Sequence, residues 1–211
     1  MNEVLRAAVI GSSSSGGWGH NIDELFIGVP GLRTVAVADD TDDGVGDALS
    51  RHRLTQTARG FLNWRKMLAD VKPDVIAICS RNIQQHAEMA IASAEAGVRG
   101  IFMEKPFVKS VQEADAVVSA CEKSNTKLNL ALVNRYCPTI TAVWELIADG
   151  KIGTLLELRA RGKEDLRGGG EDLWVLGPHV LDLMVHFGGA PQWCNATVIN
   201  NGEPVTSDDF I

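Results

Sequence analysis

The sequence has little of what marks membrane proteins and nucleic-acid-binding proteins. No stretch reaches the roughly 20 apolar residues that span a bilayer. The apolar run near the N-terminus contains Arg6 and stops at Gly11, which is too short for a secretory signal peptide. Acidic residues outnumber basic ones, 27 to 20, and the formal net charge is −7. We therefore expect neither a nucleic acid nor a membrane as a partner, because both attract basic surfaces.

Cysteine is also scarce, and its four residues are widely separated: Cys79, Cys121, Cys137 and Cys194. They form no pair with the short spacing of a zinc site and no disulfide framework of the kind found in small secreted proteins. The pattern predicts free thiols in a reducing, cytoplasmic compartment.

Short β-branched runs alternate with helical patterns in the first half of the chain. Strands are expected at residues 4–10, 34–38, 74–79, 100–103 and 127–133, and helices at 22–27, 47–54, 64–70, 84–96 and from Ser110 onward. Ser110 followed by Glu113 indicates a capping box. Such β–α units in series predict an α/β fold with a doubly wound parallel sheet.

The pattern changes near residue 135, where we expect a domain boundary. Residues 139–148 predict an amphipathic helix, 154–161 a strand with one solvent-facing side, 179–186 a helix and 193–199 a further strand. The first domain is therefore expected at 1–135 and the second at 136–211.

A glycine- and serine-rich turn follows the first predicted strand, at residues 11–20 (GSSSSGGWGH). In such a turn, backbone N–H groups can approach a pyrophosphate, and the N-terminus of the next helix favours the anion. The candidate residues are Gly11, Ser12, Ser13 and Gly16. Ser13 takes the place of the second glycine of GxGxxG, so the turn by itself fits a loop without function equally well. A P-loop is rejected because no Lys-Ser/Thr follows Gly16.

Asp39 closes the second predicted strand, twenty residues after Gly19. An acidic side chain at this place accepts hydrogen bonds from the adenosine ribose hydroxyls, and Asp39 and Asp40 together would repel a 2′-phosphate. The alternative is a simple polar turn. Turn, strand and acid in this order predict a Rossmann domain that binds NAD(H) in preference to NADP(H).

Lys105 lies in the segment 103–107 (MEKPF), directly after a predicted strand. Open α/β sheets bind ligands at this edge. A partly desolvated lysine can exchange a proton with an alcohol there, and Glu104 can hold its ammonium group. For the dipeptide taken alone, an exposed ion pair without function is the better explanation.

Several segments together resemble the family of glucose–fructose oxidoreductase and inositol dehydrogenase. They are the glycine turn, VAVAD ending at Asp39, DVIAICSRN with the nearby His86, AEAGVRGIFMEKPF and LALVNRYCP. Members of that family are substantially longer. The resemblance therefore implies a Rossmann domain followed by an α/β domain with an open mixed or antiparallel sheet, which would be incomplete at 136–211.

The same resemblance assigns roles to residues at the predicted strand ends. It implies that Lys105 is the catalytic lysine and that Glu104, Ser80 and Asn82 lie near the nicotinamide half of the cofactor. Arg135 corresponds to an arginine at the family's domain junction.

A second catalytic motif is suggested by residues 168–170 (GGG) and 176–182 (LGPHVLD), which resemble the family's approach to a catalytic histidine. That histidine would be His179. His179, Asp182 and His186 recur at helical spacing and share one face of the predicted helix. Nothing nearby has the spacing of a zinc site, so no metal is expected. Without the resemblance, a buried structural histidine is the better explanation of His179.

The sequence departs from the family pattern just before this histidine. The family usually has an aspartate four residues upstream, where this chain has Val175. Asp172 or Glu171 would supply a carboxylate from a shifted loop. Arg135, Asp172 and Asp182 are thus candidate substrate-binding residues.

The resemblance implies a cytoplasmic, homo-oligomeric NAD-dependent oxidoreductase that moves hydride between nicotinamide and a carbinol carbon of a sugar, cyclitol or related polyol. Two alternatives stay open. One is redox-assisted elimination or glycoside cleavage without net NADH production. The other is a non-catalytic NAD-binding sensor or regulatory protein, which Val175 favours and which Lys105 and His179 disfavour.

Overall fold

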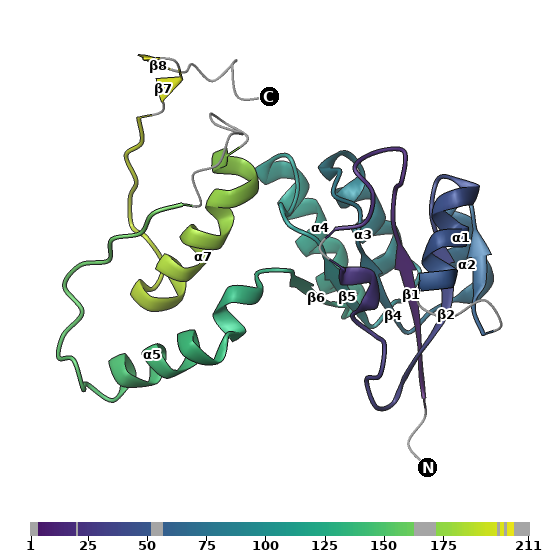
Figure 1. Cartoon of the computed structure of the whole chain (residues 1–211), viewed down its shortest axis with the longest axis horizontal. Helices are drawn as coiled ribbons and strands as arrows, with labels where there is room; N and C mark the ends of the chain where they lie inside the picture. Colours follow the sequence, from purple (N-terminus) through teal and green to yellow (C-terminus); the bar gives the residue numbers. More distant parts are fainter. Residues whose placement is uncertain are drawn as a thin grey trace. The chain divides into compact units, whose positions relative to one another are not determined.

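The chain divides into two compact units, Met1–Ala131 and Leu132–Ile211 (Figure 1). The structure, a computed structural model, describes residues 4–19, 21–51, 57–162, 172–197, 199–200 and 202–204. The sequence had placed the boundary at residue 135. Within the described ranges, no helix combines the length and the apolar character that crossing a membrane requires.

The N-terminal unit is built on one parallel sheet. Its strands lie in the order β3-β2-β1-β4-β5-β6, and every pair of neighbours is parallel. The strands are β1 (Leu5–Ile10), β2 (Leu32–Ala38), β3 (Arg59–Phe61), β4 (Val75–Ile78), β5 (Gly100–Met103) and β6 (Lys127–Leu130). The order reverses between β1 and β4, as in a doubly wound fold, which confirms the predicted Rossmann architecture.

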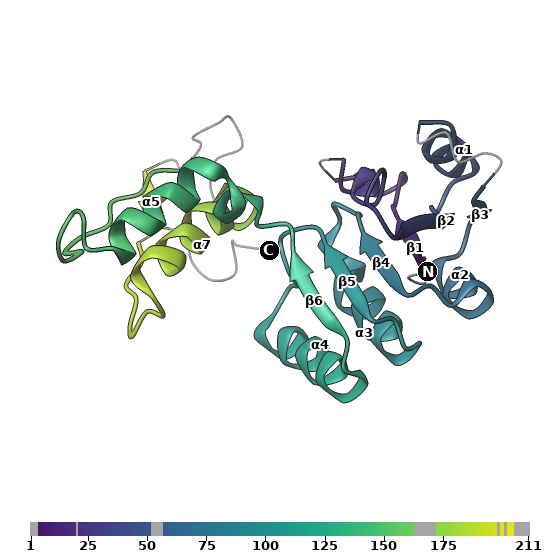
Figure 2. The same ribbon diagram turned by 90° about the horizontal axis from the view of Figure 1, so that it is seen from below.

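Both faces of the sheet are covered, which explains why the central strands are apolar throughout. Figure 2 shows α2 (Trp64–Val71), α3 (His86–Glu95) and α4 (Val111–Ser124) on one side of the sheet and α1 (Asp42–Arg51) on the other. The larger core cluster joins α2, α3 and α4 to the sheet. The smaller one lies on the other face and includes Ile22, Phe26 and Ala48.

Helix ends in this unit follow the sequence signals. Ser110 caps α4 by accepting a hydrogen bond from the Glu113 backbone N–H at 3.2 Å, and the Glu113 carboxylate accepts from the Lys109 N–H at 2.9 Å. The predicted capping box is therefore present, with its return bond displaced by one residue. Asn63 caps α2 in the same way, accepting from two backbone N–H groups of the first turn.

The helix predicted at residues 22–27 is wrong. Only a single 3-10 turn, η1 (Ile22–Glu24), forms there. Asn21 before it and Gly28 after it both have positive φ angles, 58° and 73°. Both angles fall outside the helical region, so the segment between them is too short for a stable α-helix.

Other element bounds also differ from expectation. The strand predicted at 127–133 ends at Leu130, and the 3-10 helix η3 (Val133–Tyr136) follows it. The short strand β3 was not expected, because Arg59 and Gly60 carry no β pattern, and it forms by pairing with the end of β2. Helix α1 begins five residues earlier than the predicted start at residue 47.

The C-terminal unit is mainly helical in its described part. It contains η3, α5 (Pro138–Ala148), the π-helical turn η4 (Asp172–Leu176), α7 (Gly177–Gly188) and a two-stranded antiparallel pair, β7 (Ile199–Asn200) with β8 (Glu203–Pro204). Helices were expected at 139–148 and 179–186, and both are confirmed.

The two strands predicted in this unit are wrong over most of their length. Residues 154–161 have no regular structure, and of the described residues in the segment 193–199 only Ile199 belongs to a strand. An isolated strand cannot satisfy its backbone hydrogen bonds, and in the described part of the chain the only pairing that involves these segments is that of Ile199 with Pro204. Alternating polarity indicated a strand, but it did not provide a pairing partner.

Candidate cofactor site at the carboxyl edge of the sheet

The parallel register brings the ends of β1, β2, β4 and β5 to one edge of the sheet. Ile10 pairs with both Ala38 and Ile78, and Ile78 pairs with Met103. The residues that follow these strands are therefore neighbours. They include eight of the predicted site residues: Gly11, Ser12, Ser13, Asp39, Ser80, Asn82, Glu104 and Lys105. This is the edge at which open α/β sheets bind ligands.

The turn after β1, which we call the serine loop (residues 11–19), is closed by its own backbone. The Ser12 carbonyl accepts hydrogen bonds from the N–H groups of Ser15 at 3.1 Å and Gly17 at 2.8 Å. Gly16 and Gly17 have φ angles of 89° and 71°, which favour glycine. A Cβ atom on Gly11 would lie 2.3 Å from the Trp18 ring, so this position also requires glycine.

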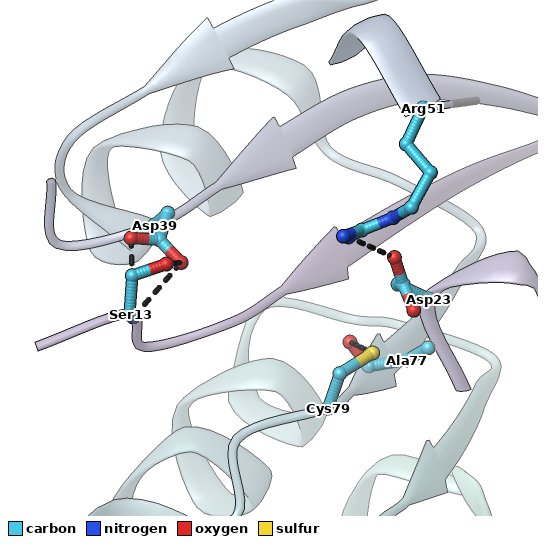
Figure 3. Close-up of polar contacts among 6 residues, drawn as sticks. All are labelled: Ser13, Asp23, Asp39, Arg51, Ala77 and Cys79. Carbon is cyan, nitrogen blue, oxygen red and sulfur yellow. Dashed lines mark hydrogen bonds and ion pairs between the residues drawn. The ribbon is translucent and has the colours of Figure 1, made fainter. Parts of the chain in front are cut away.

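Asp39 is fixed under the serine loop. Its side chain accepts hydrogen bonds from the Ser13 N–H at 3.1 Å and the Ser13 hydroxyl at 3.0 Å (Figure 3). It also accepts one from the Thr41 N–H at 3.0 Å. Asp39 is only 2% exposed. A Cβ atom on Gly44 would lie 2.2 Å from its carboxylate, so α1 approaches the carboxylate closely. The carboxylate predicted to bind ribose is thus held rigidly at the end of β2.

Asp40 has the opposite environment, because its side chain is exposed to solvent and yet strongly hydrogen-bonded. It accepts from the Ser12 hydroxyl at 2.6 Å, from the Ser14 N–H at 3.0 Å and from the Ser14 hydroxyl. Partial burial acts to raise the pKa of Asp40, but the hydrogen bonds from Ser12 and Ser14 outweigh it and lower the pKa to about 2. Asp40 is therefore an anion at neutral pH.

Asn82 connects the loop after β4 to the serine loop. Its side-chain Nδ2 donates a hydrogen bond to the Ser15 hydroxyl at 2.6 Å, and its side-chain Oδ1 accepts one from the Gln84 N–H at 2.9 Å. Ser80 accepts in turn from the Asn82 N–H at 3.1 Å. Ser80 and Asn82, two of the three residues that the resemblance placed near the cofactor, therefore shape the turn that leads into η2 (Ile83–Gln85).

Glu104 and Lys105 follow β5 and are almost fully buried, with exposures of 1% and 5%. Glu104 accepts a hydrogen bond from the Lys105 backbone N–H at 3.1 Å, and so fixes the backbone that carries the lysine. A Cβ atom on Gly19 would lie 2.5 Å from the Glu104 carboxylate. The end of the serine loop thus reaches the lysine segment. The burial contradicts the alternative of an exposed Glu–Lys pair.

His86 has a role that the sequence did not reveal. It is fully buried at the start of α3, with Nδ1 at 2.9 Å from the Pro106 carbonyl and Nε2 at 2.8 Å from the Ser80 carbonyl. The ring therefore ties the loop after β4 to the loop after β5. The available signal was a histidine among other polar residues at the start of an alanine-rich helix.

An ion pair anchors the segment 22–27, which was predicted to be a helix and contains only η1. Arg51 at the end of α1 contacts Asp23 in η1 at 2.6 Å, and the Asp23 side chain is 1% exposed (Figure 3). The same guanidinium lies 5.8 Å from the Trp18 ring centroid. Burial raises the pKa of the nearby Cys79 thiol, and the carboxylates of Asp23 and Glu104 raise this pKa further. Sequence reasoning missed both Asp23 and Arg51.

A small hollow opens beside Asp39 and Asp40 at the same edge. It is lined by Ile10, Gly11, Ser12, Ala38, Asp39, Asp40, Leu62, Trp64, Gln85 and Met89. Leu62 was not placed from sequence because β3, which precedes it, was not predicted, whereas Trp64 begins the helix expected at 64–70. Two larger hollows lie along α4 and contain none of the candidate site residues.

In the C-terminal unit the structure brings Arg135 and Asp182 together. The Arg135 guanidinium makes two contacts with the Asp182 carboxylate, one of them at 3.0 Å from Nε, and the Asp182 side chain is 6% exposed. Hydrogen bonding to Asp182 raises the pKa of Arg135. The pair joins η3 to α7, so these two predicted substrate residues bind each other.

The remaining predicted residues of this unit are placed less completely. His179 lies in the first turn of α7, and His186 stacks on Trp144 with ring centroids 6.2 Å apart. Val175 and Asp172 belong to η4, while the Asp172 side chain, Glu171 and residues 168–170 lie outside the described part of the chain. In the ranges that the structure describes, no three His, Cys, Asp or Glu residues are grouped to hold a metal ion.

Comparison with known proteins gives the fold and the family. Levoglucosan dehydrogenase of Pseudarthrobacter phenanthrenivorans is 34% identical over 110 residues, covering 50% of this chain and 28% of that protein. Inositol 2-dehydrogenase of Rubrobacter xylanophilus is 26% identical over 194 residues, covering 91% of this chain and 52% of that protein. The chain thus spans about half the length, or less, of these relatives.

Solved structures agree on the fold. An oxidoreductase from Agrobacterium radiobacter, determined in complex with NAD+, L-tartaric acid and magnesium, superposes with a TM-score of 0.73 at 21% identity, covering 88% of this chain and 55% of that one. The sequence model of the oxidoreductase family with an NAD-binding Rossmann fold matches residues 5–132, which is more than half of the chain. The chain therefore belongs to this family, the GFO_IDH_MocA oxidoreductases.

Proposed function

We propose that this chain binds NAD(H), in preference to NADP(H), at the carboxyl edge of its parallel sheet. The observation that carries the proposal is the rigid Asp39 carboxylate beside a glycine-dependent turn, at the point where the strand order reverses. The turn depends on its glycines: a Cβ atom on Gly11 would meet the Trp18 ring, and Gly16 and Gly17 have positive φ angles. Asp39 would accept hydrogen bonds from the ribose hydroxyls, and its charge would disfavour a 2′-phosphate.

We further propose that the protein is a dehydrogenase acting on a carbinol group of a sugar, cyclitol or related polyol. The bound cofactor supplies the hydride acceptor or donor. Lys105 would donate or accept the hydroxyl proton at Nζ. The hydrogen bond from the Lys105 backbone N–H to the Glu104 carboxylate keeps the lysine at the sheet edge. His179 is proposed as the second acid/base group, which rests on the family resemblance. Homo-oligomer formation and a cytoplasmic location stay predictions.

The test compares Lys105→Met with the unaltered chain. The variant should lose polyol-dependent reduction of NAD while keeping its NADH affinity within about threefold, since the lysine acts on the proton and not on the nucleotide. Lys109→Met, at an exposed ion pair with Glu113, is the matched control and should keep activity. Activity that survives Lys105→Met would refute the catalytic assignment. NADH binding without turnover of any polyol would favour the sensor.

A further inference from the structure

The serine loop binds an anion that belongs to the chain itself. The Ser12 hydroxyl, the Ser14 N–H and the Ser14 hydroxyl all donate hydrogen bonds to the Asp40 carboxylate. Three donors from one turn therefore converge on a single negatively charged group. All three donors are uncharged, so the carboxylate is bound by hydrogen bonds from the turn.

Carboxylate and phosphate oxygens satisfy such donors in the same way. Both are acceptor-only anions that take short hydrogen bonds from N–H and O–H groups. The donors lie directly after β1, where a glycine-rich turn of this fold approaches the cofactor phosphates. Asp40 thus takes up hydrogen-bond donors that a phosphate would use.

The two neighbouring acids differ in how readily they can leave. Asp39 is 2% exposed and confined by Gly44, so it cannot turn away from the loop. Asp40 follows the end of β2, and its side chain is exposed. It can rotate into solvent, where water replaces the hydrogen bonds it loses.

We propose that Asp40 is an internal competitor for phosphate, which occupies donors of the serine loop and is displaced when a phosphate-bearing ligand binds. The inference rests on the proposed function as far as the ligand is a dinucleotide. It predicts that the serine loop binds phosphate groups less tightly when the Asp40 carboxylate is present than when it is removed. It also predicts that Asp40 opposes NADPH at least as strongly as NADH.

The experiment measures dissociation constants of inorganic pyrophosphate, NADH and NADPH for the full chain and for Asp40→Asn. Calorimetry serves for pyrophosphate, and quenching of tryptophan fluorescence serves for the nucleotides. The variant keeps the shape of the side chain but removes its charge. We expect each ligand to bind Asp40→Asn about tenfold more tightly than the unaltered chain. The reason is that the variant lacks the charged carboxylate that competes for the same hydrogen-bond donors. Asp40→Ala should shift the three constants in the same direction.

Asp42→Asn is the matched control. Asp42 is an exposed acid two residues away, at the start of α1, so the control removes the same charge from the neighbourhood. A gain equal to that of Asp40→Asn would mean general charge repulsion and would overturn the proposal. Unchanged or weaker pyrophosphate binding by Asp40→Asn would also overturn it, because Asp40 would then shape the loop for its ligand.

The pyrophosphate arm separates this inference from the proposed function. If neither nucleotide binds to any variant, the proposed function fails. Tighter pyrophosphate binding by Asp40→Asn would still support the competitor, and its absence would still refute it.

Discussion

The two units of the chain treat their apolar residues differently. In the N-terminal unit, the strand runs 7–10 and 76–79 are fully buried, and three helices pack on one face of the sheet. In the C-terminal unit, α5 and α7 have no buried apolar residue. Their large apolar side chains Trp144, Leu146 and Leu181 are 44% to 53% exposed.

This difference separates the two halves of the functional proposal. The cofactor edge stands on strands with a complete core beneath them, so its residues are held by packing as well as by hydrogen bonds. The residues assigned to substrate chemistry stand on helices whose apolar sides are exposed in the described structure. The cofactor edge is thus built on a packed core, and the helix that carries His179 and Asp182 is not.

The largest expected effect comes from the same substitution made in both units. Leu68→Ala in α2 removes a side chain that is 4% exposed and should lower the free energy of unfolding by about 3 kcal/mol. Leu181→Ala in α7 removes one that is 53% exposed and should cost less than about 1 kcal/mol. Urea denaturation measures both. Equal losses of unfolding free energy for the two variants would contradict the difference in packing between the two units.

A second substitution tests how the cofactor edge is held together. Replacing His86 with Ala removes the ring whose nitrogens contact the carbonyls of Ser80 and Pro106 and should cost about 2 kcal/mol of stability. Because both loops reach the proposed site, NADH affinity should fall as well. Gln84→Ala, an exposed neighbour, is the control. Unchanged NADH affinity would show that the contacts of His86 with the two loops do not position the site.

A third substitution tests the pair that joins η3 to α7. Asp182→Asn should loosen α7 by about 1 to 2 kcal/mol, since it removes a carboxylate that is 6% exposed from its partner Arg135. Hydrogen exchange should quicken in α7 and stay unchanged in β1 and β4. Asp149→Asn, at the exposed end of α5, should change neither. Faster exchange in the central strands would contradict two separately stabilised units.

The smallest expected effect is a pH dependence from Asp40. Its pKa in the folded chain, about 2, lies below the ordinary value of 3.8, so its hydrogen bonds stabilise the fold above pH 4. This contribution is lost as the pH falls from 4 through 2. Solvent screening reduces it to about 1 kcal/mol. The stability difference between the chain and Asp40→Asn should therefore shrink over this range, and a constant difference would contradict the assignment.

The sequence predicted best those elements whose partners are close and apolar. The strand at 100–103 was predicted at its exact bounds, and the cap at Ser110 was found, because burial and capping are encoded locally. The helix at 22–27 failed because the flanking positive φ angles were not visible in the pattern. The strands at 154–161 and 193–199 failed because a strand depends on a partner that its own pattern does not specify.

The candidate site follows the same rule. Asp39 was proposed because it follows a buried strand, whereas Ser80 and the role of Lys105 came from the family resemblance; parallel pairing brings the ends of these strands together. Hydrogen bonds between loops distant in sequence were not found. Examples are the Asp40 contacts with Ser12 and Ser14 and the link made by His86. Such contacts depend on loop conformations that short motifs do not determine.

The most direct test of the central claim is a fluorescence titration of the chain with NADH and, in parallel, NADPH. We predict saturable binding with NADH tighter than NADPH, and at least about tenfold weaker NADH binding for Asp39→Ala, since a buried charged acceptor is lost. Asp43→Asn, an exposed acid on α1, should bind as the unaltered chain does. Failure to bind either nucleotide, or NADH binding that survives Asp39→Ala unchanged, would contradict a cofactor site at this edge.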